Sequence, residues 1–219
     1  MFTLSEENYL KAIYHLESHL GVSVSNNAIA EKIKTKASSV TDMIKKLAEK
    51  GLVTYKRYKG VNLTDKGRSS AISVIRKHRL WEVFLVEKLN FSWDEVHEVA
   101  EQLEHIKSEK LTQQLDAFLG FPERDPHGDP IPDKDGNFST TNKTLLINAS
   151  LNAFYNCIGV KDSSKEFLKY LNKYNLSLGT ELEVLGKEDF DGSMTIRFNN
   201  IRLNVSKDIA QNIYIKPIT

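Results

Sequence analysis

A segment rich in Pro, Gly and Asp, residues 121–139 (FPERDPHGDPIPDKDGNFS), divides this chain of 219 residues into two parts with different hydrophobic patterns. Before it, apolar residues recur every three or four positions, the period of an amphipathic helix; after it, apolar and polar residues alternate as in strands. The prolines and glycines exclude regular structure within the segment. The chain is therefore predicted to be mainly α, with a small β domain after a linker. Beyond residue 64, the expected elements are helices at 65–89, 94–107 and 164–174, a shorter helix that follows residue 107 and runs through Leu119, and strands at 153–160, 181–185, 194–198, 201–205 and 213–216.

The composition is that of an ordinary globular protein. Hydrophobic residues make up 40% and charged residues 27% of the chain, which argues against long disordered regions. No apolar run approaches the ~20 residues of a membrane-spanning helix, and the N-terminus lacks a signal-peptide pattern. The single cysteine, Cys157, excludes an intramolecular disulfide and suits a reducing compartment. We therefore expect a cytoplasmic protein of two or three small domains.

The first 64 residues carry the pattern of three short helices followed by a β-hairpin. Thr3 and Glu6 have the spacing of a capping box for the first helix, and Ser38 or Ser39 is placed to cap the third. This order of elements predicts a winged helix–turn–helix. The expected elements are helices at 6–19, 26–33 and 38–50 and strands at 52–55 and 61–63.

The third predicted helix is expected to enter the major groove of DNA with small polar side chains at its N-terminal end. Between Lys32 and Arg79, 14 basic residues stand against 3 acidic ones, and basic side chains near this helix and in the wing are suited to neutralise phosphates. Each lysine alone is explained by a solvated helix face, and the serines by N-capping, but the group favours DNA. The candidate DNA-binding residues are Lys34, Lys36, Ser38, Ser39, Thr41, Asp42, Lys45, Lys46, Arg57 and Lys59.

Two helices after the wing carry imidazoles and carboxylates at helical spacing. His78 and Glu82 are four residues apart on the first, and His97 begins a row of such residues along one face of the second. His97 and Glu104 are two turns apart, roughly 10 Å at 1.5 Å per residue, so one ion cannot bind both. We infer two sites. One would hold His78, Glu82 and His97, and the other would hold Glu101, Glu104 and His105.

The ligand types indicate which ions these sites suit. Imidazole and carboxylate bind first-row divalent ions, and no thiolate in these helices demands a softer one. This set of ligands favours Mn(II) first and Fe(II) second, and it is also compatible with Zn(II) or Co(II) in vitro. The competing interpretation is an acidic, solvated helix with incidental histidines. Three histidines and three glutamates in register on neighbouring helices favour the metal sites over that interpretation.

Both halves together resemble the diphtheria-toxin-repressor family, which includes the manganese-dependent repressors. The resemblance covers almost the whole chain and is carried by ENYLKAIYHL, ASSVTDMIKKLAEKGLV, YKGVNLTDKG, KHRLWEVFLVE, EVHEVAEQLEH, DPHGDPIP and LGTELEVL. It implies a DNA-binding domain at 1–64, a helical metal-binding and dimerisation domain with its linker at 65–142, and an SH3-like, FeoA-like barrel at 143–219. It also implies a homodimer, one or two per palindromic operator, that represses genes of metal homeostasis when loaded with metal. Neither an enzyme activity nor a membrane or organic partner is expected.

The resemblance assigns further ligands to both sites. A side chain of the C-terminal barrel completes the site of His78, Glu82 and His97, and Asp162 is our candidate. Its alternative role is to cap the helix expected to begin near Ser164.

At the site of Glu101, Glu104 and His105, the family adds a first-helix residue, which is methionine or aspartate in well-known members and Asn8 here. Glu101 replaces the cysteine of the iron-type members and resembles the manganese branch. Lys11 stands where some manganese regulators have a glutamate, which argues against their closely paired ions.

Three other functions compete with this prediction. A metal-dependent hydrolase would use the His/Glu cluster, but the chain has no HExxH motif, nucleophile elbow or Gly-rich phosphate loop. A winged-helix regulator that responds to an organic ligand would leave the cluster with a structural role, and metal analysis would distinguish it. The C-terminal barrel is also a candidate binder of peptides, although its aromatic residues are expected to form its core.

Overall fold

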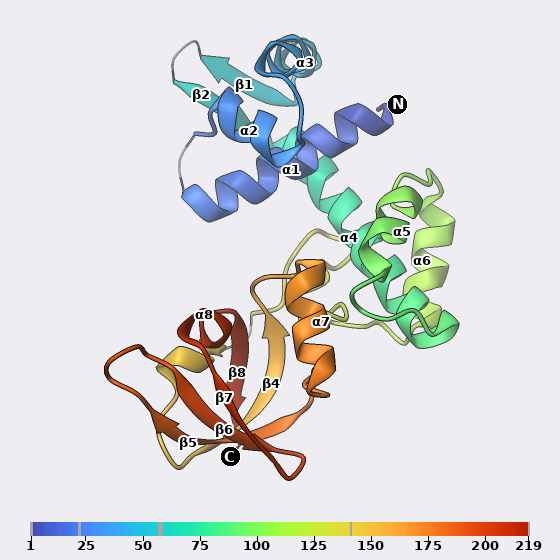
Figure 1. Ribbon diagram of the computed structural model, residues 1–219. Coiled ribbons are helices and arrows are strands. Elements are labelled where there is room, and N and C mark those ends of the chain that lie inside the picture. The colour runs from blue at the N-terminus through green and yellow to red at the C-terminus, as the bar shows by residue number, and fades with distance from the viewer. Residues whose placement is uncertain (1, 22, 57–58, 141, 219) are drawn as a thin grey trace. The chain divides into compact units, whose positions relative to one another are not determined.

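The computed structural model describes residues 2–21, 23–56, 59–140 and 142–218 (Figure 1). Contacts between residues group the chain into two compact units. Unit 1 comprises Met1–His78, Glu101–Thr112 and Pro132–Phe138, and unit 2 comprises Arg79–Ala100, Gln113–Ile131 and Ser139–Thr219.

Unit 1 contains the predicted winged helix–turn–helix. Three helices precede a two-stranded antiparallel hairpin, as Figure 1 shows in blue and cyan. Their apolar faces meet in one core, in which Leu10, Ile13, Ile44 and Leu47 are fully buried. The elements are α1 (Leu4–Leu20), α2 (Asn26–Lys32), α3 (Ala37–Glu49), β1 (Val53–Lys56) and β2 (Gly60–Leu63).

The helix caps confirm one local prediction and correct another. Thr3 and Glu6 form the predicted capping box at the start of α1. The expected capping of α3 by Ser38 or Ser39 is wrong, because the N-cap position is Lys36 and both serines lie inside the first turn. The turn before α3 is tight: Lys34 has a left-handed φ of 53°, and the Thr35 amide donates to Ala30. α3 therefore starts earlier than predicted.

Three further helices follow the wing: α4 (Asp65–Leu89), α5 (Val96–Leu103) and α6 (Glu109–Phe118). The bounds of α4 match the prediction, whereas α5 is shorter than the expected 94–107. The amide of Ile106 donates to Leu103, so Glu104 and His105 lie in a turn that follows α5 rather than on its face.

The Pro-, Gly- and Asp-rich segment contains no helix or strand, as predicted, but it is more than a linker. Asp125, His127 and Ile131 are buried. Gly128 has φ +87°, and a Cβ placed on it would lie 2.2 Å from the carbonyl oxygen of Ile158 in unit 2. Only glycine fits so close an approach of two backbones.

The C-terminal part of unit 2 is an antiparallel sheet of six strands in the order β3-β8-β4-β5-β6-β7. Bulges between Cys157 and Gly159 and between Val184 and Gly186 interrupt the register of its longer strands. Helix α7 packs on the sheet through Phe167, and residues of both share one core. The sequence predicted the longer elements but not β3, η1 or α8. The elements are β3 (Thr144–Leu145), η1 (Leu146–Asn148), β4 (Phe154–Val160), α7 (Lys165–Lys173), β5 (Glu181–Lys187), β6 (Met194–Phe198), β7 (Ile201–Val205), α8 (Lys207–Ala210) and β8 (Ile213–Pro217).

Within the described residues, no helix combines the length and the apolar character that crossing a bilayer requires.

Candidate metal centres

Unit 1 gathers six ionisable side chains from separate segments, which we call the first cluster. They come from α1, α4, α5 and the turn after α5. The residues are Glu7, Lys11, His78, Glu101, Glu104 and His105.

Glu104 is the centre of the first cluster, and its side chain is 0% exposed. Its two carboxylate oxygens lie 2.7 and 2.8 Å from Nζ of Lys11, and one of them lies 2.5 Å from Nδ1 of His78. Burial would raise the pKa of Glu104, but the hydrogen bond from His78 and the charge of Lys11 lower it. Glu104 is therefore a carboxylate whose charge is balanced by protein groups.

The first helix contributes Glu7 to this cluster rather than the predicted Asn8. Oε2 of Glu7 lies 2.6 Å from Nδ1 of His105, and both side chains are less than a tenth exposed. Asn8 is exposed. A sequence signal for Glu7 existed, because it lies four residues before Lys11 and so shares its helix face.

Unit 2 holds a second cluster, formed by Glu82, His97, Asp125 and His127. Glu82 is 2% exposed; its Oε1 lies 3.4 Å from Nδ1 of His97, and its Oε2 lies 3.7 Å from Nδ1 of His127. One ligand atom from each of Glu82, Asp125 and His127 lies within 4.8 Å of the others. His97, with 57% of its side chain exposed, borders this buried group.

Hydrogen bonds fix the orientation of the second cluster. Nε2 of His127 lies 2.7 Å from the carbonyl oxygen of Trp93, which can only accept, so Nε2 carries a proton and Nδ1 faces Glu82. Oδ1 of Asp125 accepts from the amides of His127 and Asp129. The indole of Trp93 stacks on the His127 ring at 6.3 Å. Such support is typical of histidines that bind metals.

The electrostatics of the second cluster favour a cation. Burial raises the pKa of Asp125, and the charges of Glu82 and Asp129 raise it further, although Arg79 opposes this. Burial would lower the pKa of His127, but Glu82 and Asp125 raise it well above its ordinary value. The buried carboxylates therefore draw protons to themselves. A divalent ion held by two carboxylates and an imidazole fits both this charge and the ligand preferences of Mn(II) and Fe(II).

The sequence reasoning missed Asp125 and His127 because their segment has no periodicity. Both residues lie in the motif DPHGDPIP, which carries part of the family resemblance. A histidine and an aspartate two residues apart in a Pro-rich segment were the available signal.

Two predicted ligands have other contacts in the structure. His78 lies one turn before Glu82 on α4, as predicted, while its Nδ1 faces Glu104. Asp162 accepts the amide of Ser164, which is the N-cap of α7. Because Ser164 itself is the N-cap of α7, the alternative prediction that Asp162 caps this helix is wrong.

The predicted DNA-binding residues that the structure describes lie in the turn before α3, along α3 and in the wing. Ser38, Ser39 and Asp42 are exposed, and Thr41 bridges Asn26 and the Ala37 carbonyl. Among the described basic residues of the prediction, Lys34, Lys36, Lys45 and Lys59 are exposed, Lys46 pairs with Glu6 at 3.1 Å, and Arg57 lies outside the described residues.

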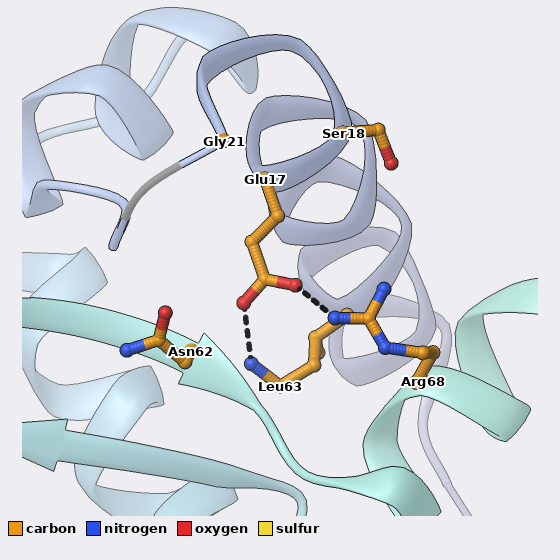
Figure 2. A pocket seen from close by; sticks show the side chains of 6 residues that line it. All are labelled: Glu17, Ser18, Gly21, Asn62, Leu63 and Arg68. Atoms are coloured by element: carbon orange, nitrogen blue, oxygen red, sulfur yellow. Dashed lines mark hydrogen bonds and ion pairs between the residues drawn. The ribbon is translucent and has the colours of Figure 1, made fainter.

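A pocket of about 280 Å³ in unit 1 lies beside the wing (Figure 2). In Figure 2, Glu17 of α1 reaches the amide of Leu63 at 2.7 Å and the guanidinium of Arg68 at 2.6 Å. Glu17 therefore ties α1 to the end of β2 and to α4. Both carboxylate oxygens of Glu17 are used in these two contacts. We therefore interpret the pocket as a consequence of the packing of α1 against β2 and α4.

Family models match three consecutive parts of the chain. Residues 1–61 match "Iron dependent repressor, N-terminal DNA binding domain". Residues 64–133 match "Iron dependent repressor, metal binding and dimerisation domain". Residues 146–217 match the "FeoA domain".

Individual relatives agree with these matches. The "Iron-dependent repressor IdeR" of Mycobacterium leprae is 38% identical over 126 residues, which span 58% of this chain and only 54% of that relative. The "Diphtheria toxin repressor" of Corynebacterium diphtheriae is 28% identical over 223 residues, 97% of this chain and 96% of the relative. A solved "Manganese-dependent transcriptional repressor complex with manganese" is 36% identical, with a TM-score of 0.84 over 97% of this chain and 100% of that one.

Proposed function

This chain belongs to the family of metal-dependent transcriptional repressors that includes the diphtheria toxin repressor and IdeR, and we propose that Mn(II) is its co-repressor. Loaded with Mn(II), or with Fe(II) as the second candidate, it binds a palindromic operator as a homodimer in the cytoplasm. The regulated genes serve metal uptake and homeostasis. Because its relatives are repressors rather than enzymes, the hydrolase interpretation is set aside.

The observation that carries the metal proposal is the second cluster. Two buried carboxylates and an oriented imidazole converge there, and the pKa of Asp125 stays raised even with Arg79 at 3.5 Å from its Oδ2. A bound divalent ion would supply further positive charge. In our proposal Glu82, Asp125 and His127 are its principal ligands, and the predicted ligands His97, His78 and Asp162 are retained as additional candidates.

The first cluster is proposed as a second metal site. Glu101, Glu104 and His105 are its predicted ligands, and the contact between Glu7 and His105 supports Glu7 as the α1 ligand in place of Asn8. Carboxylates and imidazole again match a hard or borderline divalent ion. All four residues belong to unit 1, which also contains the DNA-binding elements.

DNA binding is proposed to use the exposed end of α3. Ser38, Ser39 and Asp42 would face base edges, with Thr41 held by its hydrogen bonds to support them. Lysines around α3 and in the wing would neutralise phosphates, which makes the affinity fall steeply with salt. Because Lys46 lies 3.1 Å from buried Glu6, whereas Lys45 lies 3.9 Å from exposed Asp42, we expect Lys46 to contribute less than Lys45.

The dimer interface is proposed to involve exposed apolar side chains of unit 2. Leu89, Phe118 and Phe121 are 52%, 66% and 68% exposed. By contrast, Leu85 and Trp93 are buried within the unit. An analytical ultracentrifugation run that finds only monomer at micromolar concentration would exclude the homodimer.

The test combines DNA selection with metal binding. Operators are selected from random duplexes with Mn(II), and anisotropy then measures affinity with Mn(II), Fe(II), Zn(II), Co(II) or chelator. We expect Asp125→Asn to weaken metal-dependent binding by at least about tenfold, the usual cost of disturbing a metal's ligand shell. The matched control is Asp133→Asn, an exposed aspartate in the same segment. Equal DNA affinity with Mn(II) and with chelator would refute the co-repressor role.

A further inference from the structure

Lys11 occupies the carboxylates that a metal ion would need in the first cluster. Its Nζ lies 2.7 and 2.8 Å from the two oxygens of Glu104 and 3.2 Å from Oε1 of Glu101. The Lys11 side chain is only 13% exposed. Three donors on one ammonium are thus matched by three carboxylate oxygens.

The charges around Glu104 show why the ammonium of Lys11 stabilises the metal-free protein. A carboxylate that is 0% exposed is costly unless a cation compensates it. α1 contributes Glu7 with Lys11, and α4 contributes His78 with Lys77. Burial lowers the pKa of Lys77, while Glu7 and Glu104 raise it and Lys107 lowers it. Among these described groups, Lys11 is the cation that contacts both oxygens of Glu104.

A divalent ion at bonding distance from these oxygens would compete with the Lys11 ammonium, because the ammonium already engages all three of them and the two cations repel. We propose that Lys11 is a tethered competitor of the metal: it neutralises Glu101 and Glu104 in the metal-free protein and must leave them when the site is loaded. The inference rests on the proposed metal site of the first cluster. Lys11 thereby weakens metal binding there and raises the ion concentration at which this site fills.

The experiment isolates the first cluster in the full-length chain with Asp125→Asn as the common background. Calorimetry measures Mn(II) affinity for this background and for the same protein with Lys11→Met, which keeps the side-chain length without the charge. Lys11→Gln is a second neutral variant in case Lys11→Met does not fold. Lys11→Arg keeps the positive charge. The matched control is Lys50→Met, because Lys50 also pairs with a carboxylate that is 0% exposed, at 2.6 Å from Glu6.

We expect Lys11→Met to bind Mn(II) at least about tenfold more tightly, the scale found for close charge pairs. Lys11→Arg and Lys50→Met should keep the affinity of the background. In chelator, Lys11→Met should melt at a lower temperature than the background, and saturating Mn(II) should close that gap. The melting temperature without metal is a readout independent of DNA binding.

The outcomes separate this inference from the function on which it rests. If the background binds Mn(II) at this cluster and Lys11→Met binds it equally or more weakly, Lys11 is not a competitor and the inference is overturned alone. If neither the background nor a Lys11 variant binds Mn(II), while Glu104→Gln changes nothing, the metal assignment of the first cluster fails and the inference fails with it.

Discussion

Glu6 is a buried charged residue outside both clusters. Its side chain is 0% exposed and lies 2.6 Å from Nζ of Lys50 and 3.1 Å from Nζ of Lys46. Burial would raise its pKa, but the hydrogen bonds from Lys50 and the Thr3 amide, with Lys46, lower it from 4.5 to about 2. Glu6 thus joins the first turn of α1 to the end of α3.

The lowered pKa makes a prediction about stability and pH. A folded-state pKa below the unfolded one stabilises the protein above the unfolded value, and that contribution is lost as pH falls between about 4.5 and 2. We expect Glu6→Gln to lower the free energy of unfolding at neutral pH and to differ less and less from the wild type across that range. Urea denaturation against pH measures this, with Glu31→Gln on the exposed side of α2 as control. A constant difference at all pH values would contradict it.

At the scale of single residues, the sequence predicted ligand types and part of their grouping: Glu104 lies beside His105, and Glu82 lies beside His97. His97, Glu101, Glu104 and His105 stood out because helical spacing makes them visible. Their partners were less accessible. Glu7 rather than Asn8 faces the cluster because tertiary packing sets the rotation of α1. Asp125 and His127 lie in a loop, in which the His127 amide donates to Oδ1 of Asp125. No periodic sequence pattern predicts such an arrangement.

The elements show where local patterns are sufficient. The long α4 was predicted to its ends because its period is sustained over 25 residues. α5 ends earlier than predicted, and the Ile106 amide donates to the Leu103 carbonyl in the turn that follows it. In this turn Glu104 contacts Lys11 and His78. These tertiary contacts are not encoded in the helical pattern of the sequence. β3 and α8 span only two and four residues, too few for a period to be recognised.

One element-scale contact positions the second cluster. The loop that carries Asp125 and His127 is fixed to β4 by the hydrogen bond from the Val160 amide to the His127 carbonyl, at 2.9 Å. It is also fixed by the close approach of Gly128 to Ile158 and Gly159. The geometry of the proposed metal ligands therefore depends on the C-terminal sheet.

We expect Gly128→Ala to destabilise the protein by about 2–4 kcal/mol, since it combines a left-handed φ with a backbone clash. It should also weaken Mn(II) binding at the second cluster, because the loop must shift to admit the methyl group. Gly136→Ala is a matched control: its φ is +86°, but its Cβ would meet only Ile72 at 3.5 Å. Thermal unfolding and calorimetry measure both effects, and equal losses in the two variants would show that strain, not the clash, is responsible.

For the whole molecule, the sequence predicted the order of the structural elements along the chain, but not how contacts between residues group these elements into units. Three domains were expected, at 1–64, 65–142 and 143–219, and these limits stay a prediction. The contacts form two units, and residues 101–112 belong with the DNA-binding elements while residues 79–100 belong with the sheet. A linear division of the chain cannot represent this grouping, because it depends on packing between segments distant in sequence.

The two clusters therefore belong to different units, which allows their contributions to repression to be separated. If metal occupancy and operator binding are linked, the factor by which Mn(II) tightens DNA binding must equal the factor by which the operator tightens Mn(II) binding. We expect a total factor in the range of about 5 to 150 for ordinary coupling energies. Glu104→Gln and Asp125→Asn remove one cluster each, so their separate losses show which cluster carries the coupling.

The measurement is a closed cycle: DNA affinity by anisotropy with chelator and with saturating Mn(II), and Mn(II) affinity by calorimetry with and without the operator. The two factors agree if both ligands act through one equilibrium of the protein. If Mn(II) binds both clusters with the same affinity whether or not DNA is present, occupancy carries no information to the recognition helix, and these sites stabilise the fold without regulating it. If only Glu104→Gln abolishes the coupling, the cluster that shares a unit with α3 is the sensor, and the second cluster has a structural role.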